Sequence, residues 1–464
     1  MNAGRWIRAA SFLALAVFFV VFHVRVIRAH FGPDEMMNLY GHWQPPLWKT
    51  VAADITFWSK TVRPLGALYY LPLYQLFGLN PVPFNIVRSL LLLVNTAVFL
   101  LLAKEIARSW WVATLAAFPI AYQSNIGNLH YDGAFVYDVL CGAFYFAAFL
   151  YYLRCRRRNE SLHLRDLCIV LALYICALDS KEMAVSLPVL ILAYEVLFKG
   201  RTAKAGPALI AGALTLAFIV GKAMGAGTLT SMDAYRPVYT WERFGTSSTR
   251  FLNQLFYTDV FTPSLVLWLW AALLYVGLRN WGRRKFDPRW MFLLVWVVVT
   301  PLPIAFLPDR GGATLYIVAG GWAMMAAMAA RAIVRSAASP TIAGLPKAAI
   351  MSAGLAACIA GYWYETLIAD RILVPRYLKN GAELREAISQ IQALGTRPAS
   401  HSIVVFLNDP FPQYFDTLFI ASLVWKDPTI VIWLQNRLHL PASELGRANH
   451  TIDYVDGHFV HRSS

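Results

Sequence analysis

Apolar segments long enough to cross a membrane alternate with short polar connections over the first four fifths of the chain. A helix needs about 20 apolar residues to cross the hydrocarbon core. The pattern therefore predicts roughly eleven transmembrane helices within residues 1–369. We expect them near 9–28, 86–103, 110–127, 134–153, 166–199 (two helices), 206–224, 260–278, 290–307, a segment that ends at Arg331, and 347–368.

The segment 166–199 admits two interpretations. As one long helix it would bury the polar group Asp179-Ser-Lys-Glu182 at the membrane midplane. As two short helices hinged at that group, it returns the basic loop 199–204 to the side of the other basic loops, at 154–158 and 279–289. Because basic residues collect on cytoplasmic loops, the charge pattern favours two helices. It also predicts a cytoplasmic N-terminus and an external C-terminus.

The loop 29–85 contains an apolar run, Leu65–Leu79, that is too short to span. Such a run is typical of a re-entrant or interfacial segment.

The chain becomes soluble in character from about residue 370. Asn380 is a candidate cap for a helix over Glu383–Leu394, and a further helix is expected near 412–424. Buried strands are expected over Ser402–Leu407 and Thr429–Leu434, and Asp456-Gly457 indicates a hairpin. We therefore predict a small extracytoplasmic α/β domain over 370–464.

Composition agrees with a membrane protein. Of the 464 residues, 58% are hydrophobic and 14% are charged, with a mean hydropathy of +0.50, which no soluble domain requires. The net charge of +15 follows from the basic cytoplasmic loops, so it indicates no nucleic-acid partner. The five cysteines show no paired spacing, which argues against a disulfide framework or a zinc site. We predict a multi-pass protein of the cytoplasmic (inner) membrane.

Two adjacent carboxylates, Asp34 and Glu35, follow the first span. Pro33 prevents that helix from continuing and can open a new one, with both acids in its first turn and Asn38 one turn after Asp34. The acids are either helix caps in a solvated loop or catalytic groups.

Other ionisable residues occur in four separate loops, at the membrane face where the topology also places Asp34 and Glu35. They are Arg63, His130, Asp132, Lys181, Glu182, Asp309 and Arg310. Charges near the bilayer are costly and tend to mark function. Structural alternatives remain for His130 as a loop residue and for Lys181–Glu182 as a hinge. Asp138, inside the fourth span, requires a polar partner.

Three sequence features resemble the GT-C glycosyltransferases. They are the run from Arg63 to Pro81, the group Ser180-Lys-Glu-Met-Ala184 with Pro188, and Arg310 with Leu315-Tyr316. The resemblance covers roughly residues 10–365 and is greatest to the protein O-mannosyltransferase-like branch and to bacterial transferases that use polyprenyl-phosphate sugars. No TPR array follows the last span, and the C-terminal domain has no counterpart in this resemblance.

The resemblance implies roles for individual residues. Asp34 and Glu35 match the catalytic acidic pair of the first external loop, and Asp132 matches a second acidic site. Arg63, Lys181 and Arg310 would hold the donor phosphate by the same resemblance. We further assign His130, Glu182 and Tyr316 to substrate binding.

The chemistry of these residue types supports this interpretation. A polyprenyl phosphate is a good leaving group, whereas an acceptor hydroxyl needs a general base. Cations stabilise the phosphate, and a carboxylate stabilises an oxocarbenium-like transition state. Asp34 is our choice of base, with Glu35 as the alternative. A divalent metal held by Asp34 with Asp132 or His130 is left open, and no other cofactor is expected.

We therefore predict a glycosyltransferase that moves a sugar from a polyprenyl-phosphate-linked donor to an extracytoplasmic lipid, glycan or protein acceptor. A transporter or flippase of lipid-linked saccharides is the alternative from another class, and a non-catalytic membrane scaffold is a third. A flippase favours charged residues at mid-membrane positions. In this chain they gather at one face, which favours surface chemistry.

Overall fold

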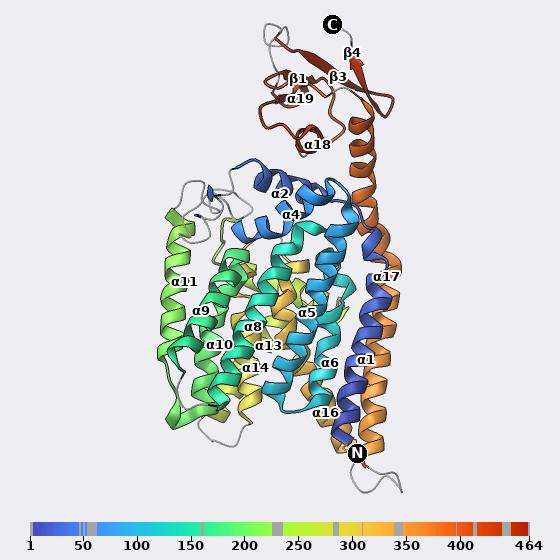
Figure 1. Cartoon of the computed structure of the whole chain (residues 1–464). Helices are drawn as coiled ribbons and strands as arrows, with labels where there is room; N and C mark the ends of the chain where they lie inside the picture. The colour runs from blue at the N-terminus through green and yellow to red at the C-terminus, as the bar shows by residue number, and fades with distance from the viewer. Residues whose placement is uncertain are drawn as a thin grey trace.

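The protein is a bundle of long helices with a small α/β domain at one end (Figure 1). The computed structural model describes residues 3–45, 48, 49, 52, 63–158, 162–224, 235–281, 287–308, 310–337, 347–395, 397–411, 415–438 and 447–462. The chain begins at the far end of the bundle and finishes in the α/β domain, so the two termini lie at opposite ends.

Helices occupy the positions of all the predicted spans. They are α1 (Ala3–His23), α5 (Pro81–Ala107), α6 (Trp110–Ala121), α8 (Val136–Arg158), α9 (Leu164–Ser180), α10 (Leu187–Tyr194), α11 (Gly206–Met224), α13 (Pro263–Trp281), α14 (Pro288–Val299), α16 (Tyr316–Ala337) and α17 (Lys347–Ala393). Among the described residues, six helical segments are long and apolar enough to cross a membrane. The chain is therefore a helical multi-pass membrane protein, as predicted, while the number eleven stays a prediction.

Small residues allow the central helices to approach closely. Ala113, Ala116 and Ala117 of α6 are fully buried, and α6 packs against α5, α16 and α1. Helices in a membrane gain little from the hydrophobic effect, so close backbone packing between small side chains supplies much of their association. Leucine and valine side chains on the outer helices face outward instead, among them Leu13 and Val17 of α1.

Two helices, α9 and α10, occupy the segment 166–199, in agreement with the interpretation from charge. Helix α9 ends at Ser180, Lys181 is extended (φ −162°, ψ 148°), and a 3-10 turn over Glu182–Ser186 leads into α10. The hinge therefore presents Lys181 and Glu182 at a break in the helix.

Two short helices cover the end of the bundle that faces the α/β domain. Helix α2 (Pro33–Trp43) begins at Pro33 after Gly32, as predicted. Helix α4 (Ala67–Phe77) lies within the short apolar run and is too short to span. Both lie between the bundle and the α/β domain (Figure 1).

Helix α17 corrects the predicted start of a separate helix at Glu383. It continues without interruption from Lys347 to Ala393 and joins the bundle to the α/β domain (Figure 1). The position 369/370 that we expected to divide the domains therefore falls inside one helix. The intervening residues are mostly good helix formers, and Pro375 inside the helix removes one backbone hydrogen bond without ending it.

An amphipathic helix, α12 (Trp241–Phe256), lies between the predicted spans 206–224 and 260–278, where no helix was predicted. The hydroxyl of Thr240 accepts a hydrogen bond from the backbone N–H of Arg243 and so caps its start. Phe251 and Leu252 are buried on one face. A cap followed by helical spacing was the sequence signal for this helix.

The C-terminal domain contains a four-stranded sheet of order β2-β1-β3-β4. Strands β1 (Ile403–Phe406) and β2 (Val431–Leu434) are parallel, and α18 (Asp416–Trp425) connects them. Strand β3 (His450–Val455) pairs parallel with β1 and antiparallel with β4 (His458–Arg462). Asp456 (φ 52°) and Gly457 (φ 85°) form the hairpin turn, as predicted.

The C-terminal domain is packed directly against α2 and α4. The rings of Tyr40 (α2) and Phe419 (α18) lie 5.1 Å apart between centroids. The Tyr74 hydroxyl (α4) donates a 2.5 Å hydrogen bond to the backbone carbonyl of Leu423 (α18). One buried apolar cluster includes side chains from all three helices. Helix α2 is therefore held between the membrane bundle and the C-terminal domain.

Candidate active site

A cavity of about 510 Å³ opens beneath α2, at the bundle end that carries the C-terminal domain. We call it the first cavity. Its described wall is formed by Asp34, Met37, Asn38, Arg63, Ala134, Phe135, Lys181, Glu182, Val185, Phe218, Ile219, Lys222, Tyr235, Pro237, Tyr239, Pro303, Ile304, Leu307, Arg310 and Thr314. The wall thus combines a carboxylate on α2 with several cations and with apolar side chains from the bundle.

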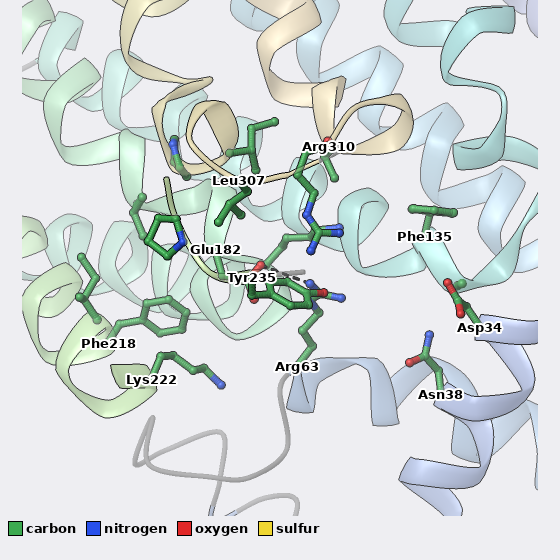
Figure 2. A pocket seen from close by; sticks show the side chains of 18 of the residues that line it. Asp34, Asn38, Arg63, Phe135, Glu182, Phe218, Lys222, Tyr235, Leu307 and Arg310 are labelled. Carbon is green, nitrogen blue, oxygen red and sulfur yellow. Dashed lines mark hydrogen bonds and ion pairs between the residues drawn. The ribbon is translucent and has the colours of Figure 1, made fainter. Parts of the chain in front are cut away.

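Asp34 and Asn38 project into the first cavity from the same face of α2 (Figure 2). Pro33 starts the helix, so Asp34 lies in its first turn, and residues four apart share a face. Burial raises the pKa of Asp34, and the nearby Arg63 guanidinium partly offsets this. A carboxylate with a raised pKa is a stronger base than an ordinary aspartate.

Arg63 lies in the middle of the cavity, between α2 and the hinge after α9 (Figure 2). Its guanidinium is 3.4 Å from the Glu182 carboxylate and lies over the Tyr137 ring at 5.3 Å. These two contacts fix the position of the Arg63 side chain, although Arg63 itself lies outside a regular helix. Arg63 and Glu182, which the sequence pattern places at the same membrane face, are therefore in contact.

Lys181 contributes to the wall while its ammonium group forms an ion pair with Asp138 of α8 at 2.5 Å. Asp138 therefore has the polar partner that its place in a span requires. Part of the positive charge of Lys181 is neutralised by this contact, so its effect on a bound anion is smaller than that of a cation without an ion pair.

Arg310 enters the cavity from the loop before α16. Its guanidinium lies over the Tyr235 ring at 4.2 Å. On the opposite side from Asp34, the Lys222 ammonium lies 5.6 Å from the Phe218 ring (Figure 2). The sequence interpretation missed Lys222 and Phe218, although a lysine near the end of an apolar span expected to lie outside was a visible exception to the charge rule.

Glu35 and Asp132 lie behind the cavity wall and do not contribute to it. Glu35 is 2% exposed, and its carboxylate accepts a 3.1 Å hydrogen bond from the Gly133 N–H. Burial raises the pKa of Glu35 to about 7. Asp132 accepts a 2.9 Å hydrogen bond from the Ala134 N–H, and burial raises its pKa to about 6. The acidic pair is therefore divided, because only Asp34 reaches the first cavity.

Arg88 is a buried cation close to these acids that the sequence interpretation missed. Its guanidinium donates hydrogen bonds to the Asn85 side chain at 2.6 Å and to the backbone carbonyl of His130 at 2.7 Å. Its charge favours ionisation of both Glu35 and Asp132. An arginine inside an apolar segment such as α5 is costly, so its position in the sequence already indicated a functional or structural role.

His130 and Tyr316 do not line the described wall of the first cavity, and their assignment to substrate binding stays a prediction. The His130 ring is fully buried and forms a 3.0 Å hydrogen bond with the His23 ring. Tyr316 is also buried, and its hydroxyl points toward the backbone carbonyl of Ile120 at 3.4 Å. Sequence order alone does not show which face of a helix end is covered by protein.

A divalent metal held by Asp34 with Asp132 or His130 stays open. Within the described ranges, no three or more His, Cys, Asp or Glu side chains lie together in a way that could hold a metal ion. The His130 ring forms its hydrogen bond with the His23 ring. Asp309, another member of the predicted polar group, lies outside the described residues.

The overall fold is similar to that of solved membrane enzymes. ArnT from Cupriavidus metallidurans bound to undecaprenyl phosphate matches at 12% identity and a TM-score of 0.52, over 98% of this chain and 94% of that one. The apo form of the same protein matches at 13% identity and a TM-score of 0.53, with the same shares of both chains.

A third match is the Archaeoglobus fulgidus oligosaccharyltransferase tethered to an acceptor peptide. It shows 11% identity and a TM-score of 0.54, over 92% of this chain and 64% of that one. Neither the protein-family models nor the curated proteins that were searched match the sequence. At these identities the likeness concerns architecture, and it confirms the predicted resemblance at that level: the chain has the GT-C fold.

Proposed function

We propose that the chain is a glycosyltransferase that moves a sugar from a polyprenyl-phosphate-linked donor to an acceptor at the external face of the cytoplasmic membrane. The observation that carries the proposal is the wall of the first cavity, where Asp34 lies opposite Lys222, with Arg63 and Arg310 between them. The N-terminus would lie in the cytoplasm and the C-terminal domain outside.

The composition of the cavity suits such a donor. Phe218, Ile219 and Leu307 offer an apolar surface at the ends of membrane helices, where a prenyl chain can lie. Arg310 and Lys222 offer positive charge for its phosphate. The structure of ArnT with undecaprenyl phosphate supports the choice of lipid carrier, because a protein of the same fold binds one.

The residues act as a base and as stabilisers of the leaving group. Asp34 accepts the proton of the acceptor hydroxyl while the acceptor oxygen forms a bond to the anomeric carbon. The bond between that carbon and the phosphate oxygen breaks, and the polyprenyl phosphate leaves with the electron pair. Arg310 and Lys222 stabilise the charge that develops on this phosphate, with Arg63 as a further contributor.

Asp34→Asn tests the base directly, because it keeps the size of the side chain and removes its basicity. We expect transfer by the purified variant to fall about a hundredfold to ten-thousandfold at saturating donor. Asp259→Asn, at an exposed position outside the cavity wall, is the matched control and should retain the parental rate. Transfer by Asp34→Asn within a few-fold of the parent would show that Asp34 is not the base.

The same preparation tests the alternative of a flippase. A transferase releases free polyprenyl phosphate in step with the glycosylated product. A parent chain that moves the lipid-linked sugar across vesicle membranes without this release would replace the proposal.

A further inference from the structure

A second cavity, of about 370 Å³, adjoins the first cavity. Phe135, Arg310 and Thr314 belong to the walls of both. The second cavity is completed by Asn125, Asn128, Arg250, Gln254, Gly311, Gly312 and Tyr377. Arg310 therefore faces a space on each side of the loop that carries it.

The loop Arg310–Gly312 is fixed by two amide side chains of the second cavity. The Asn128 side-chain oxygen accepts a 2.9 Å hydrogen bond from the Ala313 N–H, and the Gln254 side-chain oxygen accepts one of 2.9 Å from the Gly312 N–H. Gly312 has a φ of +58°, and the Asn128 amide leaves no room for a side chain there. Since both amide oxygens are used by the loop, each amide directs its NH₂ group elsewhere as a donor.

Two guanidinium groups and three amide side chains, of Asn125, Asn128 and Gln254, supply much of the polar surface of the second cavity. The Asn125 amide donates a 2.9 Å hydrogen bond to the backbone carbonyl of Gln254. Arg250 of α12 contributes a second guanidinium to the wall that also contains Arg310. The Tyr377 hydroxyl donates to the Ser124 carbonyl at 3.1 Å, and the Thr314 hydroxyl donates to the Gly311 carbonyl at 2.9 Å. The described wall contains no carboxylate. A wall of two guanidinium groups and amide donors suits an anion.

An apolar third cavity, of about 360 Å³, lies on the other side of the turn that ends α12. Gln254 belongs to the second cavity, whereas the next residues, Leu255, Phe256 and Tyr257, belong to the third. The rest of its wall comes mainly from small and apolar residues of α6, α16 and α17, among them Ala323 and Ala327. Such a surface suits a hydrocarbon chain.

We propose that the second cavity binds the anionic head group of a lipid acceptor, a phosphate monoester in the simplest case, while the third cavity receives part of its hydrocarbon chain. This inference rests on the proposed function, which already assigns the first cavity to the donor. Arg310 would then contact both anions from its shared position. The order of the cavities brings the acceptor head group to Phe135, at the boundary of the cavity that contains Asp34.

Binding of short lipids to the purified full-length chain in neutral detergent tests the proposal. The probes are dioctanoyl phosphatidic acid, dioctanoylglycerol, which lacks the anion, and inorganic phosphate, which lacks the chain. We expect phosphatidic acid to bind in preference to both. Arg250→Gln should weaken its binding at least about tenfold, the loss expected for one charge-assisted hydrogen bond. Arg243→Gln, on the same helix outside the cavity wall, is the matched control.

Asn128→Asp provides a second variant that preserves the loop. A carboxylate still accepts the Ala313 N–H, but it places a negative charge where the NH₂ group was. Phosphatidic acid should therefore bind this variant more weakly than the parent as well. Equal binding to the parent and to both variants would overturn the proposal. Equal affinities for phosphatidic acid and dioctanoylglycerol would also overturn it, and inorganic phosphate that binds as tightly as phosphatidic acid would exclude the lipid.

The outcome can be separated from that of the proposed function. Asp34→Asn should bind phosphatidic acid as the parent does, because Asp34 is not in the second cavity. Retained transfer by Asp34→Asn would therefore refute the base without affecting this site. Unchanged phosphatidic acid binding in Arg250→Gln would refute the site and leave the base assignment intact.

Discussion

Replacing Glu35 with glutamine separates the two members of the acidic pair. Glu35 is 2% exposed, and its carboxylate accepts a hydrogen bond from the Gly133 N–H at 3.1 Å. A glutamine oxygen can accept the same hydrogen bond, while the charge disappears. We expect Glu35→Gln to retain transfer within about tenfold of the parent, in contrast to the loss of a general base. The variant should also change how stability depends on pH.

The magnitude follows from the shift in the pKa of Glu35. Burial raises it from 4.5 to about 7. The folded chain therefore holds this proton more tightly than the unfolded chain, and the free energy of unfolding falls as pH rises from 4.5 to about 7. At about 1.4 kcal/mol per pKa unit, the burial of the charge costs about 3 kcal/mol above that range. An amide NH₂ without a partner costs about 1 kcal/mol. Above that pH range the Glu35→Gln variant should therefore be more stable than the parent by about 2 kcal/mol.

Thermal unfolding of the purified parent and variant between pH 5 and pH 9 measures this difference. The variant should melt at a higher temperature than the parent at pH 9. At pH 5 this advantage should disappear, because Glu35 is then mostly protonated. Two melting curves that stay parallel across the whole range would refute the reasoning. A loss of transfer in Glu35→Gln as large as that in Asp34→Asn would show that the base has been assigned to the wrong carboxylate.

Three further predictions concern the first cavity and its support. Arg310→Lys keeps the charge but loses the paired contact to a phosphate, so donor binding should weaken about tenfold or more; unchanged affinity would remove Arg310 from the phosphate site. Because burial raises the pKa of Asp34, the transfer rate should rise with pH and then level off, and the midpoint of the rise should lie above pH 3.8. A pH–rate profile whose midpoint lies below 3.8 would contradict this. Gly133→Ala would place a methyl group against the Glu35 carboxylate. The variant should therefore be less stable than the parent by about 1–3 kcal/mol, with a lower melting temperature and a lower transfer rate. A melting temperature and a transfer rate equal to those of the parent would show that α2 can move without cost.

The sequence was most informative where polarity interrupts an apolar pattern. The charge rule favoured a break between α9 and α10 because two helices return the basic loop 199–204 to the side of the other basic loops. The turn residues Asp456 and Gly457 located the hairpin for a similarly local reason, since both have positive φ. These features depend on nearby residues, which a sequence displays directly.

The division between Asp34 and Glu35 depends on tertiary packing and could not be predicted in this way. Adjacent residues on a helix point about 100° apart, and α2 is covered on more than one side by protein. Only the packing of the loop at Gly133 and of α18 shows which carboxylate faces a cavity. Tertiary packing also determines that His130 and Tyr316 are absent from the described wall of the first cavity and that Lys222 of α11 belongs to it.

The continuity of α17 has a mechanical consequence. A 47-residue helix is about 70 Å long, which exceeds the thickness of a hydrocarbon core of about 30 Å. The N-terminal part of α17 therefore packs in the bundle, and its C-terminal part carries the C-terminal domain. An unbroken helix resists bending. We therefore expect the domain to move by a tilt of the whole of α17 or by a bend of α17 at Pro375, where a backbone hydrogen bond is missing. Since α18 of that domain contacts α2, either motion would displace the helix that carries Asp34.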